Sequence, residues 1–157
     1  MFTLDDTDRR LLRQLQAVGD GGGDAGLSDL AARCGVTVAT ASRRLARLEN
    51  AGVIEGYEAV IDWRALGFAV EVSLRVNLDK TQPRAFDDFI DAARDIPEVM
   101  DIQTFLGRVD VRLTVLARDM RHYQEIYRDR ILALPHINDI EALVLVSDVK
   151  NSESLPL

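Results

Sequence analysis

Residues that commonly build disulfides, metal sites and catalytic centres are scarce in this sequence. It has one cysteine, Cys34, and two histidines, His122 and His136. A single cysteine cannot form a disulfide within the chain, and the Cys-x-x-Cys and His-x-x-x-His spacings of zinc sites do not occur. Cys34 falls on the apolar stripe of a predicted helix, which favours a small buried side chain over a nucleophile. We therefore expect no metal, no cofactor and no internal disulfide.

Long apolar runs are missing as well. No segment approaches the roughly 18 consecutive apolar residues of a membrane-spanning helix. The N-terminal segment MFTLDDTDRR also lacks the basic start and apolar stretch of a secretion signal. These two absences predict a soluble, cytoplasmic protein that does not bind membranes.

Positive charge is in short supply, and it is unevenly distributed. The chain of 157 residues carries 19 basic and 26 acidic side chains, a formal net charge of -7. Residues 1–52 hold seven of each sign, so the whole negative excess lies in residues 53–157. DNA binding depends largely on neutralising phosphates, so the net charge alone argues against it. The N-terminal part, which has no net charge, still permits DNA binding.

The N-terminal part predicts three short helices. Residues 5–18 place apolar side chains on one helical stripe, with Asp5 as N-cap; the stripe comprises Leu11, Leu12, Leu15 and Val18. The glycine-rich stretch 19–26 predicts a surface loop, because it lacks the Gly-Lys-Ser/Thr of a phosphate-binding loop. A helix over 27–34 is followed by Gly35, and the next begins after Thr37 and ends at Gly52. This order, a helix, a three-residue turn and a second helix, is typical of a helix-turn-helix.

The second part predicts a β-α-β-β-α-β order. The segment 53–62 alternates loosely and favours a small β-wing or a linker strand, and from Ala69 the apolar period changes from 3.6 to 2. The expected elements are a strand 69–78, a helix 83–94, strands 99–106 and 109–117, a helix of about 120–132, and a strand 137–149. This order predicts a ferredoxin-like sheet with both helices on one face, whose other face a second subunit would cover. The fold class is thus α+β, a winged helix-turn-helix followed by a ferredoxin-like domain.

The third helix carries a basic face. If Ala41, Leu45 and Leu48 point inward, a rotation of 100° per residue leaves the basic and small side chains outside. Arg44 falls at the flank, where it would brace the helix or reach a phosphate. The predicted DNA-binding residues are Thr37, Ala39, Thr40, Arg43, Arg44 and Arg47. Arginines also cluster on ordinary solvated helices, so the prediction that this face binds DNA depends on the surrounding residues as well as on the arginines.

The residues of both parts resemble one known family. The segments LDDTDRRLLRQLQ and LSDLAARCGVTVATASRRLARLENAGVIEGYEAVID resemble the DNA-binding half of the Lrp/AsnC, or feast/famine, regulators, with Thr37, Arg44, Leu48 and Glu49 matching its recognition-helix pattern. The segment that ends LPHINDIEALVLVSDVK is similar to their effector domain. The resemblance implies a DNA-binding domain with a linker strand over 1–62, and an effector-binding and oligomerisation domain over 63–157. It also implies dimers that exchange strands, assembly into tetramers or octamers, and amino acids or related acids bound between subunits.

The predicted effector site centres on one turn. By the same resemblance, Gly107 and Asp110 match the Gly-x-x-Asp turn that lines the family's ligand pocket, although an ordinary β-turn would also explain them. The family usually has a threonine before this glycine and an aromatic residue before this aspartate, where the present chain has Leu106 and Val109. The four residues Leu106, Gly107, Val109 and Asp110 therefore predict a pocket for a more apolar small-molecule effector, or for none.

Three alternatives remain beside an effector-controlled regulator. The protein could organise DNA without an effector, or its helix-turn-helix could bind protein or be purely structural. Sirohaem decarboxylases resemble the same two-part architecture, but their active sites depend on histidines and other polar groups. Here His122 and His136 look like solvated surface groups, and no catalytic arrangement follows from the spacing. We predict a regulator and not an enzyme.

Overall fold

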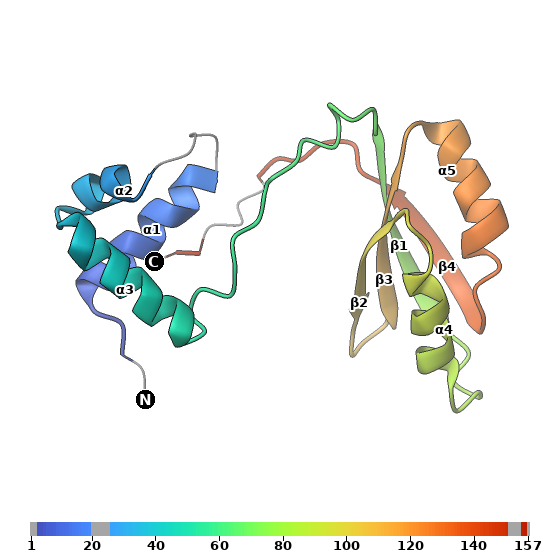
Figure 1. Cartoon of the computed structure of the whole chain (residues 1–157). Helices are drawn as coiled ribbons and strands as arrows, with labels where there is room; N and C mark the ends of the chain where they lie inside the picture. Colours follow the sequence, from blue (N-terminus) through green and yellow to red (C-terminus); the bar gives the residue numbers. More distant parts are fainter. Residues whose placement is uncertain (1–2, 20–25, 151–154, 157) are drawn as a thin grey trace. The chain divides into compact units, whose positions relative to one another are not determined.

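The computed structural model describes residues 3–19, 26–150 and 155–156. These residues divide into two compact units (Figure 1). One unit takes the described residues up to Ile61 together with the C-terminal ones from Lys150, and the other is Asp62–Val149. Leu155 belongs to the first unit, where its amide donates to Oε1 of Gln16 at 2.5 Å. Residues 20–25 of the predicted glycine-rich loop lie outside the described residues.

The first unit contains the three predicted helices. They are α1 (Asp6–Gly19), α2 (Leu27–Cys34) and α3 (Val38–Asn50). Gly35 ends α2 at a φ of 66°, in the left-handed region that glycine adopts at low cost. Thr37 caps α3, because its Oγ1 accepts the amide hydrogen of Thr40 at 3.2 Å. The short turn between these two caps sets α2 and α3 in the helix-turn-helix arrangement.

A small apolar core holds these helices together. Its buried members are Leu11, Leu30, Ala31, Cys34 and Ala41. Cys34 is 2% exposed, as expected for a small buried side chain, and this burial raises the pKa of its thiol. The cysteine therefore contributes packing and not reactivity.

The second unit has the predicted β-α-β-β-α-β order. Its elements are β1 (Val70–Leu78), α4 (Ala85–Arg94), β2 (Val99–Thr104), β3 (Val111–Ala117), α5 (Met120–Ile126) continued by a π-helical turn (Tyr127–Ile131), and β4 (Ile137–Val144). The four strands form one antiparallel sheet in the order β2-β3-β1-β4. Figure 1 shows α4 and α5 on the same face of this sheet.

The core of the second unit lies between the sheet and its helices. Val72, Leu74 and Val76 of β1 are fully buried, and the residues between them face the other side of the sheet. Phe89 of α4 packs against them without solvent exposure. The alternation read from the sequence thus corresponds to the two faces of β1.

Two expected strands differ from the structure by more than two residues. None of residues 53–69 of the described chain is in a strand, because an extended segment becomes a strand only beside a hydrogen-bonding neighbour. The final strand ends at Val144 and not at Val149. Its partner β1 begins at Val70, and the last ladder bond joins the amide of Leu145 to the carbonyl of Glu71 at 2.9 Å. Within the described residues, no helix has the length and apolar character needed to cross a membrane.

Phe89 and Phe86 allow a matched test of this core, because both lie on α4. Phe89 is fully buried, whereas Phe86 is 37% exposed. Phe89→Ala removes buried apolar surface and leaves a cavity, so it should lower the free energy of unfolding by about 3–5 kcal/mol. Phe86→Ala should cost about 1 kcal/mol or less. Urea unfolding followed by circular dichroism measures both, and equal losses would contradict the assigned core.

Candidate nucleic-acid interface and effector site

The N-terminal half of α3 presents small and basic side chains to solvent. Thr37, Ala39 and Arg43 are exposed, and Thr40 is half-buried. The hydroxyl of Thr37 donates to that of Thr40 at 2.9 Å. Arg43 makes no hydrogen bond or ion pair with any described residue. We call Thr37, Ala39, Thr40 and Arg43 the outer face of α3.

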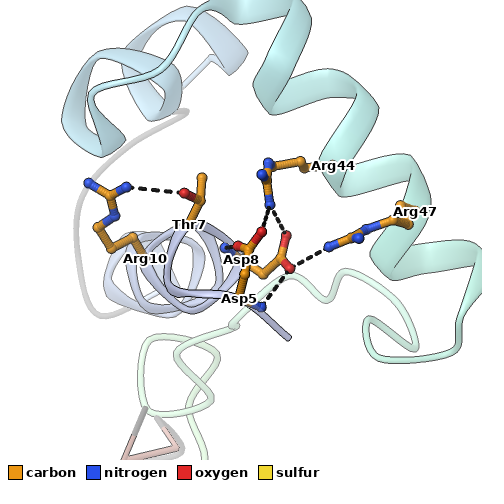
Figure 2. Close-up of polar contacts among 6 residues, drawn as sticks. All are labelled: Asp5, Thr7, Asp8, Arg10, Arg44 and Arg47. Atoms are coloured by element: carbon orange, nitrogen blue, oxygen red, sulfur yellow. Dashed lines mark hydrogen bonds and ion pairs between the residues drawn. The ribbon is translucent and has the colours of Figure 1, made fainter. Parts of the chain in front are cut away.

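The two other arginines of α3 are engaged by the start of α1 (Figure 2). Nη1 of Arg44 lies 2.5 Å from Oδ2 of Asp5 and 2.9 Å from Oδ1 of Asp8. Nη2 of Arg47 donates to Oδ2 of Asp8. We call these four residues the Asp-Arg cluster.

The two aspartates of the cluster also cap the N-terminus of α1. The amide of Asp5 donates to Oδ2 of Asp8 at 3.0 Å, and the amide of Asp8 donates to Oδ1 of Asp5 at 2.9 Å. This reciprocal pair is a capping box, which satisfies amides that the first turn leaves open. Asp8 is fully buried, so its charge depends on the arginines for compensation. The sequence pointed to Asp5 as a cap, but it carried no signal that either aspartate contacts α3.

The ion pair between Asp5 and Arg44 shifts the pKa values of both groups. The hydrogen bond from Arg44, aided by the amide of Asp8, lowers the pKa of Asp5 to about 2. The bonds to Asp5 and Asp8 raise the pKa of Arg44 in turn. Both pKa shifts favour the charged pair, so Asp5 and Arg44 stay ionised over the whole physiological range.

Among the described residues, a side-chain hydrogen bond joins the segment after α3 to the helix, in addition to the backbone bonds of the turn that ends it. The hydroxyl of Tyr57 donates to Oε1 of Glu49 at 2.8 Å. Leu48, beside it, is fully buried, as its inward position on the helical stripe predicts. Glu49 therefore contacts the following segment, which gives a structural reason for an acidic residue at this position.

Asp110 of the predicted effector turn makes contacts within the second unit. It is 4% exposed, and its Oδ2 accepts the amide hydrogen of Leu78 at 3.0 Å. Its amide donates to the carbonyl of Val76 at 3.1 Å. Its Oδ1 lies 3.0 Å from Nζ of Lys80. Asp110 thus joins the end of β1 to the start of β3.

A hollow of about 420 Å³ lies beside these contacts. Its lining residues are Asn77, Leu78, Asp79, Lys80, Gly107, Arg108, Asp110 and Asn138. Of the four predicted effector residues, Gly107 and Asp110 line it. Leu106 is fully exposed and Val109 half-buried, and neither lines the hollow.

Lys80, Arg108 and Asn138 were missed by reasoning from the sequence. The predicted sheet topology could have found Lys80, because the end of β1 lies beside the start of β3 in this antiparallel order. The side chain of Arg108 and the approach of Asn138 depend on turns whose geometry no local pattern specifies.

The two histidines have partners and do not form a metal site. Nδ1 of His122 accepts the amide hydrogen of Arg118 at 3.2 Å. Nε2 of His136 lies 3.2 Å from Oδ2 of Asp88, and this bond lowers the pKa of Asp88. In the part of the chain that the structure describes, no three metal-ligating side chains come together.

The fold and these surfaces define a class of protein: a DNA-binding regulator with a helix-turn-helix and a ligand-binding α/β domain. Residues 4–55 match the family description "Winged helix-turn-helix DNA-binding". Residues 71–155 match the description "Lrp/AsnC ligand binding domain". The chain belongs to the Lrp/AsnC family of transcription regulators.

Relatives resemble this chain over nearly its full length. It is 31% identical to the proline dehydrogenase transcriptional activator of Rhodobacter capsulatus, across 97% of each chain. It is 29% identical to the leucine-responsive regulatory protein of Escherichia coli strain K12, across 97% of this chain and 90% of that one. A transcriptional regulator from Neisseria meningitidis, solved with L-methionine, has a TM-score of 0.87 at 27% identity, across 98% and 97% of the two chains.

These relatives decide between two of the earlier alternatives. They are transcription regulators and not enzymes, so the prediction of a regulator over a decarboxylase-like enzyme is confirmed. The predicted fold class is confirmed as well.

Acid titration tests the Asp-Arg cluster. The pKa of Asp5 is about 2 in the folded state and 3.8 without its partners, so its contribution is fully present above about pH 4 and is lost as the pH falls through about 2. Asp5→Asn should therefore lower the midpoint of urea unfolding near neutral pH, and the difference from the unsubstituted chain should vanish near pH 2. Asp6→Asn removes a neighbouring carboxylate outside the cluster and is the control. A deficit of Asp5→Asn that stays constant with pH would exclude this role of Asp5.

Proposed function

We propose that the outer face of α3 binds the major groove of DNA. The observation that carries this proposal is Arg43, an exposed guanidinium without a partner among the described residues, in the first half of α3. A free guanidinium can contact a phosphate or the O6/N7 edge of guanine. Ala39 and Thr40 beside it are small enough to let the backbone approach the bases, and Thr37 lies where the first-turn amides meet a phosphate.

Arg44 and Arg47 take a different role in this proposal. Both are bound to Asp8, and the side chain of Arg44 is 25% exposed against 48% for Arg47. These contacts support bracing of α3 by Arg44, with Arg47 able to reach DNA only at its exposed edge. Phosphate neutralisation by α3 then depends most on Arg43.

The second unit senses a small metabolite in this proposal, and an amino acid or a related acid fits it best. The hollow beside Asp110 brings the cations of Lys80 and Arg108 close to the carboxylate of Asp79 and the amide of Asn138. A zwitterion needs such a mixture of charges. A feast or famine regulatory protein from M. tuberculosis, 30% identical to this chain with a TM-score of 0.79, was solved with L-methionine.

The predicted effector residues divide into two groups here. Gly107 and Asp110 shape the hollow itself. Leu106, fully exposed, is available to a second subunit, and Val109 is half-buried beside Asp110 in the chain. A site completed between subunits accounts for both groups.

A homodimer, able to assemble further into tetramers or octamers in the cytoplasm, completes the proposal. Tyr57, Val60 and Ile61 are each at least 65% exposed in a segment that is not part of any strand of the described chain. Exposed apolar side chains on an unpaired extended segment favour pairing with a second copy. This is the exchange of strands that the family resemblance implies.

Arg43→Ala tests the DNA interface. It should weaken binding to duplexes from upstream of the protein's own coding sequence and reduce the slope of log affinity against log salt by about 1 per recognition helix. The melting temperature should stay unchanged, because Arg43 has no partner to lose among the described residues. Fluorescence anisotropy over a series of KCl concentrations measures affinity and slope.

Arg121→Ala on α5 is the control for Arg43→Ala. Arg121 is also exposed, and its loss changes the net charge equally, so DNA affinity and salt slope should not change. An Arg43→Ala protein that binds like this control would exclude the outer face of α3 as the interface.

Thermal unfolding with a panel of amino acids, L-methionine and branched-chain ones included, tests the sensor. A ligand of the folded state should raise the melting temperature in proportion to ln[ligand], and Lys80→Ala should abolish this rise. Lys80 is 67% exposed, so its loss opens no cavity and removes only the ion pair to Asp110, whereas Asp110→Ala, which should also abolish the rise, removes a buried support.

Lys150→Ala, which replaces the only other lysine, should keep the rise. A rise that persists in Lys80→Ala would exclude this hollow as the site. A full panel without any rise would leave a DNA-organising protein without an effector.

A further inference from the structure

The recognition helix α3 is fixed to α1 by two kinds of contact. On one side of α3, Ala41 and the half-buried Leu45 pack against Leu11 and its neighbours in the apolar core. Apolar contact of this kind resists separation but has little directional preference. Arg44 and Arg47 of the same helix make charged hydrogen bonds to α1, as Figure 2 shows. These bonds are the directional part of the attachment.

Asp8 is the centre of the directional contacts. Its side chain is fully buried and both of its oxygens are occupied. Oδ1 accepts from Arg44 at 2.9 Å, while Oδ2 accepts from Arg47 and from the amide of Asp5. Arg44 and Arg47 are three residues apart, so they lie on the same side of α3. Two planar guanidiniums bound to one immobile carboxylate fix the rotation of α3 about its own axis.

That rotation decides where the outer face points. Arg43 precedes Arg44 by one residue, a turn of 100° around the helix. Any rotation of α3 that releases Arg44 therefore moves Arg43 and Thr40 by the same angle. The cluster also compensates the charges of Arg44 and Arg47 with those of Asp5 and Asp8, which removes two cations from competition for phosphates.

We propose that Asp8 is a positioning residue for DNA recognition, which holds α3 at the angle that base contacts need and keeps Arg44 and Arg47 from binding phosphates indiscriminately. The proposal rests on the assignment of the outer face of α3 to DNA. Base contacts depend strictly on orientation, whereas phosphate contacts form from many orientations. Asp8 therefore acts on the ratio of specific to non-specific affinity, and not on affinity alone.

Asp8→Asn tests this role against a matched control, Asp6→Asn. Both variants remove one negative charge from the first turn of α1, but Asp6 is exposed and lies outside the cluster. The probes are a duplex that the unsubstituted protein selects from random-sequence DNA and a shuffled duplex of the same composition. Anisotropy over a salt series gives both affinities and both salt slopes.

The two variants should respond differently. Asp8→Asn should weaken binding to the selected duplex about tenfold, the size of one lost base contact, and tighten binding to the shuffled duplex with a steeper salt slope. Asp6→Asn should change both affinities equally and keep their ratio. If Asp8 acted only through its charge, Asp8→Asn would tighten binding to both duplexes. Opposite changes in the two affinities therefore distinguish a positioning role from an electrostatic one.

An unchanged affinity ratio and salt slope in folded Asp8→Asn, with only a lower melting temperature, would overturn the proposal. If Asp8→Asn does not fold, Arg47→Lys replaces it, because lysine keeps the charge but loses the planar fork. Its affinity ratio should fall, and an unchanged ratio would again overturn the positioning role. Arg43→Ala separates the two hypotheses: if it leaves DNA binding unchanged, the interface is wrong, and if it weakens binding while Asp8→Asn keeps the ratio, only the positioning role is wrong.

Discussion

The carboxylate of Asp8 has no access to water, and its charge must be compensated from within the protein. A buried unpaired carboxylate is costly enough that the fold has to bring cations to it. Arg44 and Arg47 supply them from a helix that lies more than thirty residues further along the chain. This contact and the apolar core together hold α1 against α3, and in our proposal the contact sets the direction of the outer face of α3.

A second carboxylate, that of Asp110, has a comparable structural role in the α/β unit. Asp110 is nearly buried, and it accepts the amide hydrogen of Leu78 while pairing with Lys80. In both units an aspartate at the start of one element is bound by groups from another element. The second contact shapes the hollow that we assign to the effector. The same residue can therefore belong to an ordinary structural turn and to the wall of a ligand site.

Elements with a local cause were predicted well. The caps at Thr37 and Gly35 bound α3 and α2 where the sequence placed them, because capping depends on residues within one turn. The strand β1 followed from alternation of its apolar residues. The segment 53–62 was wrongly expected to form a strand, since its alternation is a preference that only a hydrogen-bonding neighbour turns into structure. The predicted length of β4 was wrong for the same reason.

The sequence by itself determined the family, the order of the elements and which arginines lie near the surface of α3, since each of these follows from local pattern or from residue identity. Only the tertiary structure decided that Arg44 and Arg47 are bound to Asp5 and Asp8, whereas Arg43 has no partner among the described residues. It also decided that Lys80 and Asp110 meet at one hollow. These pairings join residues far apart in the chain. Their geometry depends on how whole elements pack, which no short stretch of sequence specifies.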